Sequence, residues 1–193
     1  MANVRDGNKG VLVVVDVQVG VMRDSWDAPR VIAKVARTVE RARAQNVPVL
    51  WVQHSSDELA DGSAAWQWVP ELVPAPGELR VHKRHPSSFE ATPLEAELAA
   101  LGASHITLAG AQTNWCMRAT AYAALERGYD LTLVKDAHTT EPLVLGNGTR
   151  IEASGMVDDL NVAMTWLSYP GRTTSTATAE EADFAAAGRS AVS

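Results

Sequence analysis

The feature that most constrains the fold is an unbroken run of apolar, mostly β-branched residues, Val-Leu-Val-Val-Val, at positions 11–15. A strand with one face in water alternates apolar and polar residues, and this run has no polar position to present to solvent. Continuous runs of this kind are typical of strands covered on both faces, as in a parallel sheet between two layers of helices. The run therefore favours an α/β domain.

Later segments repeat the pattern, because further strand-like stretches alternate with stretches whose apolar residues recur at helical spacing. We expect strands over residues 11–15, 47–54, 79–83, 106–109, 130–134 and 172–177, and helices over residues 28–45, 93–101, 116–127, 150–167 and 180–187. This order predicts a three-layer α/β/α fold with a central, mostly parallel six-stranded sheet and right-handed crossovers. We expect a single domain over residues 1–193, with flexible ends at residues 1–9 and 188–193.

Composition narrows the class of partner. The chain has 193 residues and a formal net charge of −6, which argues against nucleic acid as the main partner. Its single cysteine cannot form an internal disulfide, which is typical of a reducing compartment. The first nine residues lack the apolar core of a secretory signal, and residues 11–15 are too few to span a bilayer. These features predict a cytoplasmic protein that acts on a small molecule, with no membrane or nucleic-acid partner.

Three residues with useful chemistry lie at the carboxyl ends of expected strands. Asp16 ends the first, Lys83 ends the third, and Cys116 lies just beyond the fourth. Sites in open α/β sheets form outside these strand ends, so neighbouring strands would bring the three side chains into one crevice. Each also has a structural alternative: Asp16 as a turn former, Lys83 in a solvated basic turn, and Cys116 as a small buried hydrophobe. The combination of acid, base and thiol is what indicates a catalytic site.

A chemical role follows for each member of the set. Cys116 would meet the unpaired N–H groups at the start of a helix, which lowers the pKa of a thiol. Lys83 would stabilise the thiolate by charge, and Asp16 would accept the thiol proton and later deliver it to a leaving amine. The sulfur would attack a carbonyl-type carbon and form an acyl-enzyme that water hydrolyses. Backbone N–H groups between Gln112 and Cys116 would bind the oxyanion.

Several segments, taken in order, resemble the isochorismatase-like cysteine hydrolases. They are Val-Val-Asp-Val-Gln at 14–18, Trp-Gln-Trp-Val-Pro-Glu-Leu at 66–72, Val-His-Lys-Arg-His-Pro at 81–86, Leu-Ala-Gly-Ala-Gln-Thr-Asn-Trp-Cys-Met-Arg-Ala-Thr-Ala at 108–121, Gly-Tyr-Asp at 128–130 and Val-Lys-Asp-Ala-His at 134–138. The resemblance implies a catalytic triad of Asp16, Lys83 and Cys116, with a cis peptide bond between Ala111 and Gln112. It also implies an oxyanion site formed by the N–H groups of Gln112 and Cys116. A homodimer or homotetramer, whose neighbouring subunit contributes to the pocket, is implied as well.

The resemblance also narrows the reaction. Isochorismatases proper cleave a vinyl ether and lack the cysteine, so Cys116 indicates the branch that hydrolyses amide-type bonds. Nicotinamidases of the family bind a metal through an Asp-x-His pair and a further His, but Val52 stands where that aspartate is expected and no second His follows His54 before His82. We therefore expect no metal and no cofactor. Asn114 and Met117 depart from residues common in the family, which leaves the triad intact and the substrate open.

The candidate substrate contacts are His54, Trp66 and Trp115. Residues 55–78 form an irregular connection that is long for a compact domain and typical of a lid or binding loop. Trp66 and Trp68 in this loop would form an apolar wall of the pocket or, alternatively, anchor the loop on the core. Trp115, beside the expected nucleophile, would contact substrate or pack. His54 would line the pocket from the end of the second strand.

The sequence as a whole predicts a cysteine hydrolase that cleaves a C–N bond (amide, ureido or cyclic amide) of a small molecule through a thiol-linked acyl-enzyme. Two alternatives stay open. One is a vinyl ether hydrolase in which Asp16 acts and Cys116 is a bystander, and the other is a non-catalytic binding protein of the same fold. A flavodoxin-like nucleotide binder would need a glycine-rich phosphate loop after the first strand, where residues 16–23 offer only Gly20.

Overall fold

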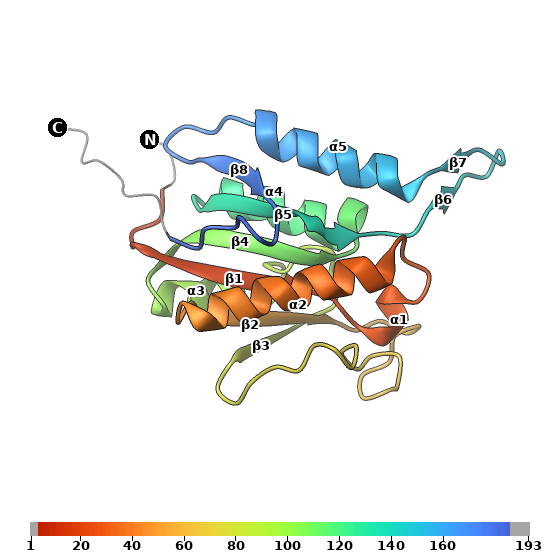
Figure 1. Ribbon diagram of the computed structural model, residues 1–193, viewed down its shortest axis with the longest axis horizontal. Coiled ribbons are helices and arrows are strands. Elements are labelled where there is room, and N and C mark those ends of the chain that lie inside the picture. The colour runs from red at the N-terminus through yellow and green to blue at the C-terminus, as the bar shows by residue number, and fades with distance from the viewer. Residues whose placement is uncertain (1–3, 186–193) are drawn as a thin grey trace.

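Six parallel strands form the centre of the structure, a computed structural model that describes residues 4–185 (Figure 1). The strands of this sheet are β1 (Lys9–Val15), β2 (Val49–His54), β3 (Leu79–Lys83), β4 (Ala103–Ala111), β5 (Asp130–Thr139) and β8 (Thr174–Ala177). Their order is β3-β2-β1-β4-β5-β8, and every neighbouring pair is parallel. The expected six-stranded sheet is confirmed.

Helices cover both faces of this sheet and complete the expected three layers. They are α1 (Val19–Met22), α2 (Ala28–Ala44), α3 (Leu94–Ala100), α4 (Arg118–Glu126) and α5 (Ala153–Trp166), with a π-helical turn at Thr113–Met117. Apolar residues of α3, α4 and α5 belong to one buried cluster, and those of α2 belong to a second cluster on the opposite face. Figure 1 shows α2 in front of the sheet and α3 and α4 behind it.

Strand β1 explains why the first apolar run has no polar position. Val11, Val13 and Val15 belong to the cluster beneath α3 and α4, while Leu12 and Val14 belong to the cluster beneath α2. All five are essentially inaccessible to solvent. Fully burying an aliphatic side chain of this size contributes about 1.5–3 kcal/mol, so a polar residue at any of these positions would be costly.

Two expected helices differ from the structure. The helix expected over 150–167 begins at Ala153, because Arg150–Ile151 pairs instead as strand β7 with β6 (Leu143–Val144) in a short antiparallel hairpin. The helix expected over 180–187 is not formed by residues 180–185, and residues 186–187 lie outside the described residues. Residues 179–181 form a turn instead, and Ala182 and Phe184 are buried in the cluster beneath α2.

The irregular connection 55–78 is tied to the segment that follows β1. The side-chain amide of Gln18 donates to the carbonyls of His54 and Trp66, at 3.0 and 2.8 Å, and its oxygen accepts the N–H of His54 at 2.8 Å. Gly20 N–H also donates to the carbonyl of Ala65 at 2.7 Å. The connection therefore has a fixed path over the carboxyl ends of β1 and β2.

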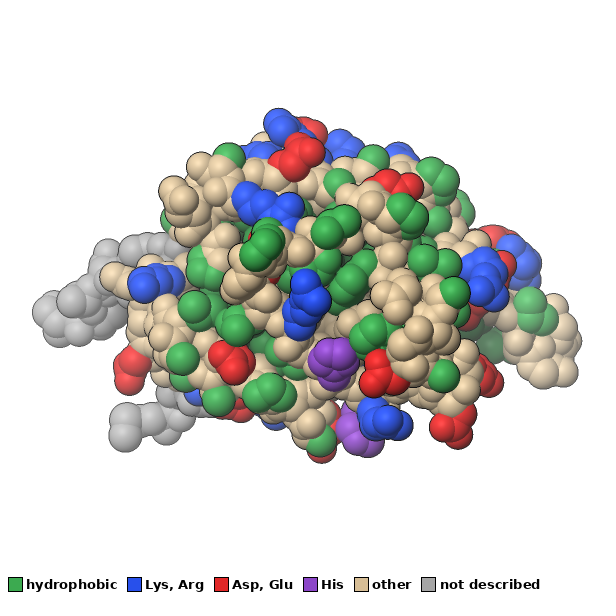
Figure 2. Space-filling model, turned by 90° about the horizontal axis from the view of Figure 1, so that it is seen from below, with side chains coloured by type: hydrophobic (Ala, Val, Ile, Leu, Met, Phe, Trp, Pro, Cys, Tyr) green, Lys and Arg blue, Asp and Glu red, His purple; other side chains and the backbone are tan. Residues whose placement is uncertain are grey.

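The surface at the β3 edge carries histidine, basic, acidic and apolar side chains close together (Figure 2). Across residues 4–185, no helix is both long enough and apolar enough to cross a membrane.

Candidate active site

Asp16, Lys83 and Cys116, which are far apart in the sequence, meet at the carboxyl edge of the sheet. The Lys83 ammonium lies 2.6 Å from Asp16 Oδ2 and 3.1 Å from Cys116 Sγ. The side chains of Lys83 and Asp16 are 0% and 1% exposed, so the ion pair is shielded from water. The sheet order places β1 between β2 and β4, with β3 outside β2, so a long lysine side chain reaches across to the other two groups.

The backbone at the end of β1 is unusual. Asp16 has a φ of 52°, in the left-handed region, where aspartate and asparagine are the best tolerated residues after glycine. Its N–H donates to Val52 and its carbonyl accepts from the N–H of Gln18, both at 2.8 Å. A non-glycine residue held in this region costs on the order of 1–3 kcal/mol, and such residues cluster at functional sites.

A glycine in β4 allows the two central strand ends to approach. Gly110 has a φ of 135°, and a Cβ at this position would lie 2.0 Å from the carbonyl oxygen of Val15. No side chain fits at that distance, so only glycine permits the contact. Two residues later the chain turns, and the Ala111–Gln112 peptide bond is cis, at the position that the resemblance implies.

Cys116 lies inside the π-helical turn Thr113–Met117 and not at the start of an α-helix. The regular helix α4 begins two residues later, at Arg118. The expected helix N-terminus at Cys116 is therefore wrong in detail, because the chain first makes a wider turn. π-helical turns are rare and frequent at functional sites.

Electrostatics at the site also differ from the sequence prediction. Burial and, as the next largest effect, the carboxylate of Asp16 raise the pKa of the Cys116 thiol to about 12, against the opposing effect of Lys83. The expected lowering is wrong because burial, the largest effect, and the charge of Asp16 together outweigh the stabilisation of a thiolate by Lys83. The resting site thus holds a protonated thiol beside an ion pair.

The pKa values of both members of that ion pair are raised. Burial raises the pKa of Asp16, and the opposing effect of Lys83 is smaller. Burial works against the charge of Lys83, but the carboxylate of Asp16 outweighs it and raises the pKa of the lysine. A carboxylate with a raised pKa is a stronger base than an ordinary aspartate.

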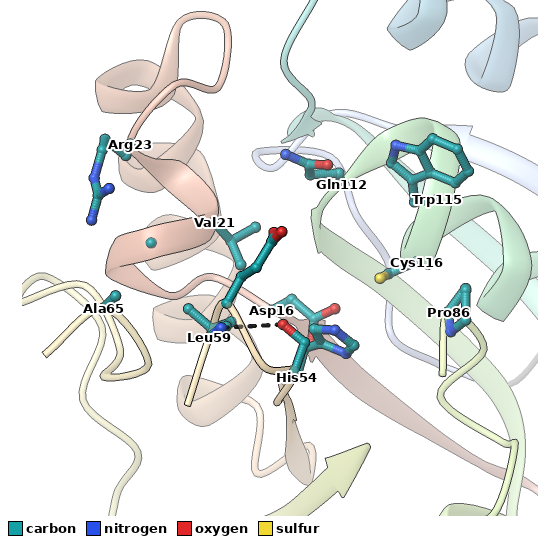
Figure 3. A pocket seen from close by; sticks show the side chains of 13 residues that line it. Asp16, Val21, Arg23, His54, Leu59, Ala65, Pro86, Gln112, Trp115 and Cys116 are labelled. Atoms are coloured by element: carbon teal, nitrogen blue, oxygen red, sulfur yellow. Dashed lines mark hydrogen bonds between the residues drawn. The ribbon is translucent and has the colours of Figure 1, made fainter. Parts of the chain in front are cut away.

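Asp16 and Cys116 form part of the wall of a cavity of about 500 Å³, whereas Lys83 lies behind them and does not line it. Two expected substrate contacts, His54 and Trp115, line it as well, together with Gln112 (Figure 3). Trp115 is 51% exposed, so much of its indole is available to a ligand. The cavity therefore gathers the expected nucleophile, the expected acid and two of the three expected contacts.

Trp66, the third expected contact, does not line this cavity. Its indole N–H donates to Ser55 Oγ at 2.8 Å, and its ring stacks on His82 with the centroids 5.5 Å apart. Trp68 packs edge-on against buried Trp51 at 5.3 Å. Both tryptophans hold the connection 55–78 in place, which is the anchoring alternative.

His54 is held in one protonation state by its neighbours. Burial, with a smaller contribution from the charge of Lys83, lowers its pKa to about 4. Its Nδ1 lies 3.4 Å from the Lys83 ammonium, which can only donate, so Nδ1 is the acceptor and the ring proton sits on Nε2. At neutral pH His54 is an uncharged hydrogen-bond donor beside the nucleophile.

Sequence reasoning missed a buried network behind the nucleophile. His138, from β5, contacts Thr113 Oγ1 at 2.9 Å through Nδ1 and Asn161 Oδ1 at 3.0 Å through Nε2. Asn161 donates its amide to the Lys135 carbonyl, so its oxygen must accept from His138, and Nδ1 must accept from the Thr113 hydroxyl. The signal that the sequence offered was His138 itself, a polar residue close to the end of the fifth strand.

The cavity wall also contains groups that no motif marked. Val21 belongs to α1 and Arg23 directly follows it, while Glu58 and Leu59 belong to the connection 55–78.

Within the described residues, no group of three or more His, Cys, Asp and Glu side chains is arranged to hold a metal ion.

Comparisons with known proteins show which proteins the chain is similar to. The chain is 31% identical over 134 residues to the secreted isochorismatase effector Isc1 of Verticillium dahliae. The aligned region covers 66% of this chain and 70% of that protein. It is 30% identical over 178 residues to the ureidoacrylate amidohydrolase RutB of Methylobacterium radiotolerans. That alignment covers 74% of this chain and 69% of that protein. It is 32% identical over 136 residues to a streptothricin hydrolase of Streptomyces noursei, covering 67% of this chain and 54%, about half, of that relative.

Solved structures share the fold. An isochorismatase from Pseudomonas putida superposes with a TM-score of 0.76 at 25% identity, covering 88% of each chain. A cysteine hydrolase from Pseudomonas syringae gives 0.77 at 18% identity, again covering 88% of each, and that likeness concerns the fold. The family model described as the isochorismatase domain matches residues 10–143. Because that match spans more than half of the chain, the protein belongs to the isochorismatase family.

Proposed function

We propose that the protein is a cysteine hydrolase that cleaves the C–N bond of a small amide, ureido compound or cyclic amide. The observation that carries the proposal is the contact of one buried ammonium, Lys83, with both Asp16 Oδ2 and Cys116 Sγ at the edge of an open cavity. Relatives named as a streptothricin hydrolase and a ureidoacrylate amidohydrolase support hydrolysis of amide-type bonds.

The first half of the reaction forms an acyl-enzyme. The thiol proton moves to Asp16 as the Cys116 sulfur bonds to the carbonyl-type carbon, and the C=O electron pair moves to oxygen. The backbone N–H groups of Gln112 and Cys116 stabilise that oxyanion, an effect worth about 2.7–4 kcal/mol for one donor. When the C=O bond re-forms, the C–N bond breaks and the leaving nitrogen takes the proton from Asp16.

The second half returns the enzyme to its resting state. Water attacks the thioester carbon and gives one proton to Asp16, and collapse of the intermediate breaks the C–S bond. The sulfur recovers the proton and the acid product leaves. The raised pKa values of the thiol and the carboxyl group suit this order of steps. The proton passes between two buried groups, and the thiolate forms only as the sulfur attacks.

A second candidate is hydrolysis of a vinyl ether by Asp16 without participation of the thiol. The observation in its favour is the pair of pKa values, since burial preserves the acid form of Asp16 to higher pH and keeps Cys116 protonated. In that reaction Asp16 would donate its proton to the vinyl carbon, and water would add to the resulting oxocarbenium ion and return a proton to Asp16. The adduct would then break its C–O bond and release the alcohol.

Activity of the Cys116→Ala variant separates the two candidates. We expect the wild-type protein to release ammonia from members of a panel of primary amides, ureido acids and cyclic amides, and to show an acyl adduct on residue 116 by mass spectrometry. Cys116→Ala should lose this activity by on the order of 10⁶-fold, as triad nucleophiles do, while melting near the wild-type temperature. Full turnover by the alanine variant would reject the thiol mechanism, and turnover of a vinyl ether alone would favour the second candidate.

A further inference from the structure

The end of β5 contacts the chain on both sides of Gln112, a residue that lines the cavity beside the expected nucleophile (Figure 3). On the amino-terminal side, Gly110 pairs with His138 in the register of β4 and β5. Ala111 likewise pairs with Thr139. The chain that leads into Gln112 is therefore held by the last residues of β5.

On the carboxyl-terminal side of Gln112, two side chains of the π-helical turn are tied to the same strand end. Thr113 Oγ1 lies 2.9 Å from His138 Nδ1. Thr140 Oγ1 donates to Asn114 Oδ1 at 2.5 Å. Thr113, His138 and Thr140 are each at most 1% exposed, so water does not compete for these bonds. One strand end thus clamps the residues before and after a single backbone N–H.

The strand end reaches the turn because β5 departs from regular pairing. Leu108 pairs with Leu133, but Gly110, two residues later in β4, pairs with His138, five residues later in β5. With regular pairing, Lys135 would lie beside Gly110. The extra residues of β5 form a bulge, and bulges beside active sites re-aim side chains. The bulge is what brings His138 to the turn.

Asn161 of α5 holds the bulge in this form. Its amide donates to the carbonyl of Lys135, inside the bulge, at 3.1 Å, and its oxygen accepts from His138 Nε2 at 3.0 Å. Nδ1 of His138 is then the acceptor for the Thr113 hydroxyl, so the direction of each hydrogen bond is fixed. A buried polar network whose groups are paired in this way is rigid.

We propose that Thr113, His138 and Asn161 are positioning residues that hold the N–H of Gln112 toward the oxyanion of the acyl-transfer reaction. The inference rests on the proposed function and adds the groups that prepare its oxyanion site. None of the three lines the cavity, so they act through the turn and not on the substrate. A donor stabilises the oxyanion most when it already points at that oxygen before the reaction begins.

Two reagents that differ in their need for an oxyanion site test the inference without knowledge of the substrate. With p-nitrophenyl acetate, the Cys116 sulfur bonds to the acetyl carbon through a tetrahedral oxyanion, and p-nitrophenol leaves with the thiol proton. Iodoacetamide alkylates the same sulfur by direct displacement of iodide and forms no oxyanion. The initial release of p-nitrophenol and the mass of the alkylated protein give the two rates, and their ratio reports on the oxyanion site.

Thr113→Val removes the hydroxyl at nearly constant shape. It should lower the ratio of acylation to alkylation by about 10–100-fold, because a whole oxyanion donor is worth about 10²–10³-fold and this one is displaced, not removed. Thr113→Ser restores the hydroxyl and should recover most of the ratio. Thr132→Val is the matched control: this buried threonine lies 2.9 Å from His105 Nε2 and does not line the cavity, so its loss should leave the ratio unchanged.

His138 provides a second test from the other end of the same hydrogen bond. His138→Leu should lower the ratio as Thr113→Val does and, with any amide that is turned over, should reduce kcat while KM stays near wild type. His138→Gln keeps an acceptor and a donor and should recover most of both. The double variant Thr113→Val, His138→Leu should lose no more than the worse single variant, since both changes remove one bond.

The possible failures are distinguishable. An unchanged ratio in Thr113→Val and His138→Leu, with Cys116 still acylated, would overturn the positioning role and leave the hydrolase intact. An equal fall of acylation and alkylation would overturn it as well, because the network would then support the turn as a whole. A loss that Thr113→Ser and His138→Gln do not recover would assign the effect to packing. A wild-type protein that is alkylated but never acylated would reject the acyl-enzyme itself.

Discussion

Asp16 is the residue on which the chemistry depends most. It is buried, it is paired with Lys83, and it adopts a left-handed backbone conformation that few residues tolerate. In the proposed mechanism its charge acts in two opposing ways, since it would accept the thiol proton and it also raises the pKa of the thiol. The two roles predict different consequences for a single substitution.

Asp16→Asn should separate turnover from thiol reactivity. Loss of the base should reduce amide hydrolysis by about 10²–10⁴-fold. Loss of the negative charge should lower the pKa of Cys116, so its alkylation by iodoacetamide at pH 8 should become about tenfold faster or more. Steady-state kinetics and alkylation rates give the two readouts.

Asp27→Asn is the matched control, because Asp27 also has a left-handed φ, of 51°, and does not line the cavity. It should change neither rate. Slower alkylation in Asp16→Asn would show that the carboxylate does not raise the pKa of the thiol. Comparison of melting temperatures would separate these effects from the cost of leaving Lys83 without its buried partner.

At the scale of elements, the position of Cys116 is set by a short irregular turn. The π-helical turn follows β4 and is held from behind by the hydrogen bond between Thr113 and His138 of β5. The short helix α1, pinned to the connection 55–78, contributes part of the opposite wall. Neither element is long enough to show the repeated apolar spacing from which a helix is predicted.

Gly20→Ala tests the close contact between α1 and the connection 55–78. The new Cβ would meet Leu59 and Ala65 at 2.8–3.1 Å, so α1 must shift. We expect a loss of about 1–3 kcal/mol in the free energy of unfolding, typical of overpacking, and a higher KM because the cavity wall moves. Denaturant melts and kinetics measure the two effects.

Gly155→Ala provides the comparison, since a Cβ on this α5 glycine meets nothing within 4 Å. There the substitution should be neutral or stabilise the protein by up to about 1 kcal/mol. Equal stability of the two variants would indicate that α1 is not tightly packed on the connection.

At the scale of the whole molecule, buried histidine links stability to pH. Burial lowers the pKa of His138 to about 4, against about 6.5 in the unfolded chain. The unfolded state therefore binds more protons below pH 6.5, and this contribution to stability is complete above pH 6.5 and lost as the pH falls toward 4. The loss amounts to about 3 kcal/mol, from about 1.4 kcal/mol for each pKa unit.

His138→Gln should flatten that dependence. Glutamine can still accept from Thr113 and donate to Asn161, so the variant should fold at pH 7 with a modest loss of stability. Between pH 6.5 and 4, its free energy of unfolding should fall less steeply than that of the wild type, as measured by urea titrations at several pH values. His85→Gln, at an exposed histidine, should keep the wild-type slope, and the same slope in His138→Gln would contradict the buried-neutral assignment.

The strands and their order of appearance could be predicted from the sequence because each signal is local. A continuous apolar run such as 11–15 can be satisfied only by cover on both faces, and the helical period of 28–45 supplies that cover. The helix predicted over 180–187 rested on a weaker signal and was wrong for residues 180–185. The composition of that segment favours a helix, but burial of Ala182 and Phe184 overrides this propensity. The homodimer or homotetramer implied by the resemblance stays a prediction.

The sequence by itself determined the α/β class, the parallel sheet and the three polar residues that follow its strands. Only the tertiary structure decided that Lys83 reaches both Asp16 and Cys116, that Trp66 lies outside the cavity and that Arg23 faces into it. The thiol pKa likewise depends on how deeply the sulfur is buried and on the charges of Asp16 and Lys83 beside it. Propensity and periodicity act between neighbours in the chain, whereas desolvation and Coulomb energies depend on distances in space, which the fold alone sets.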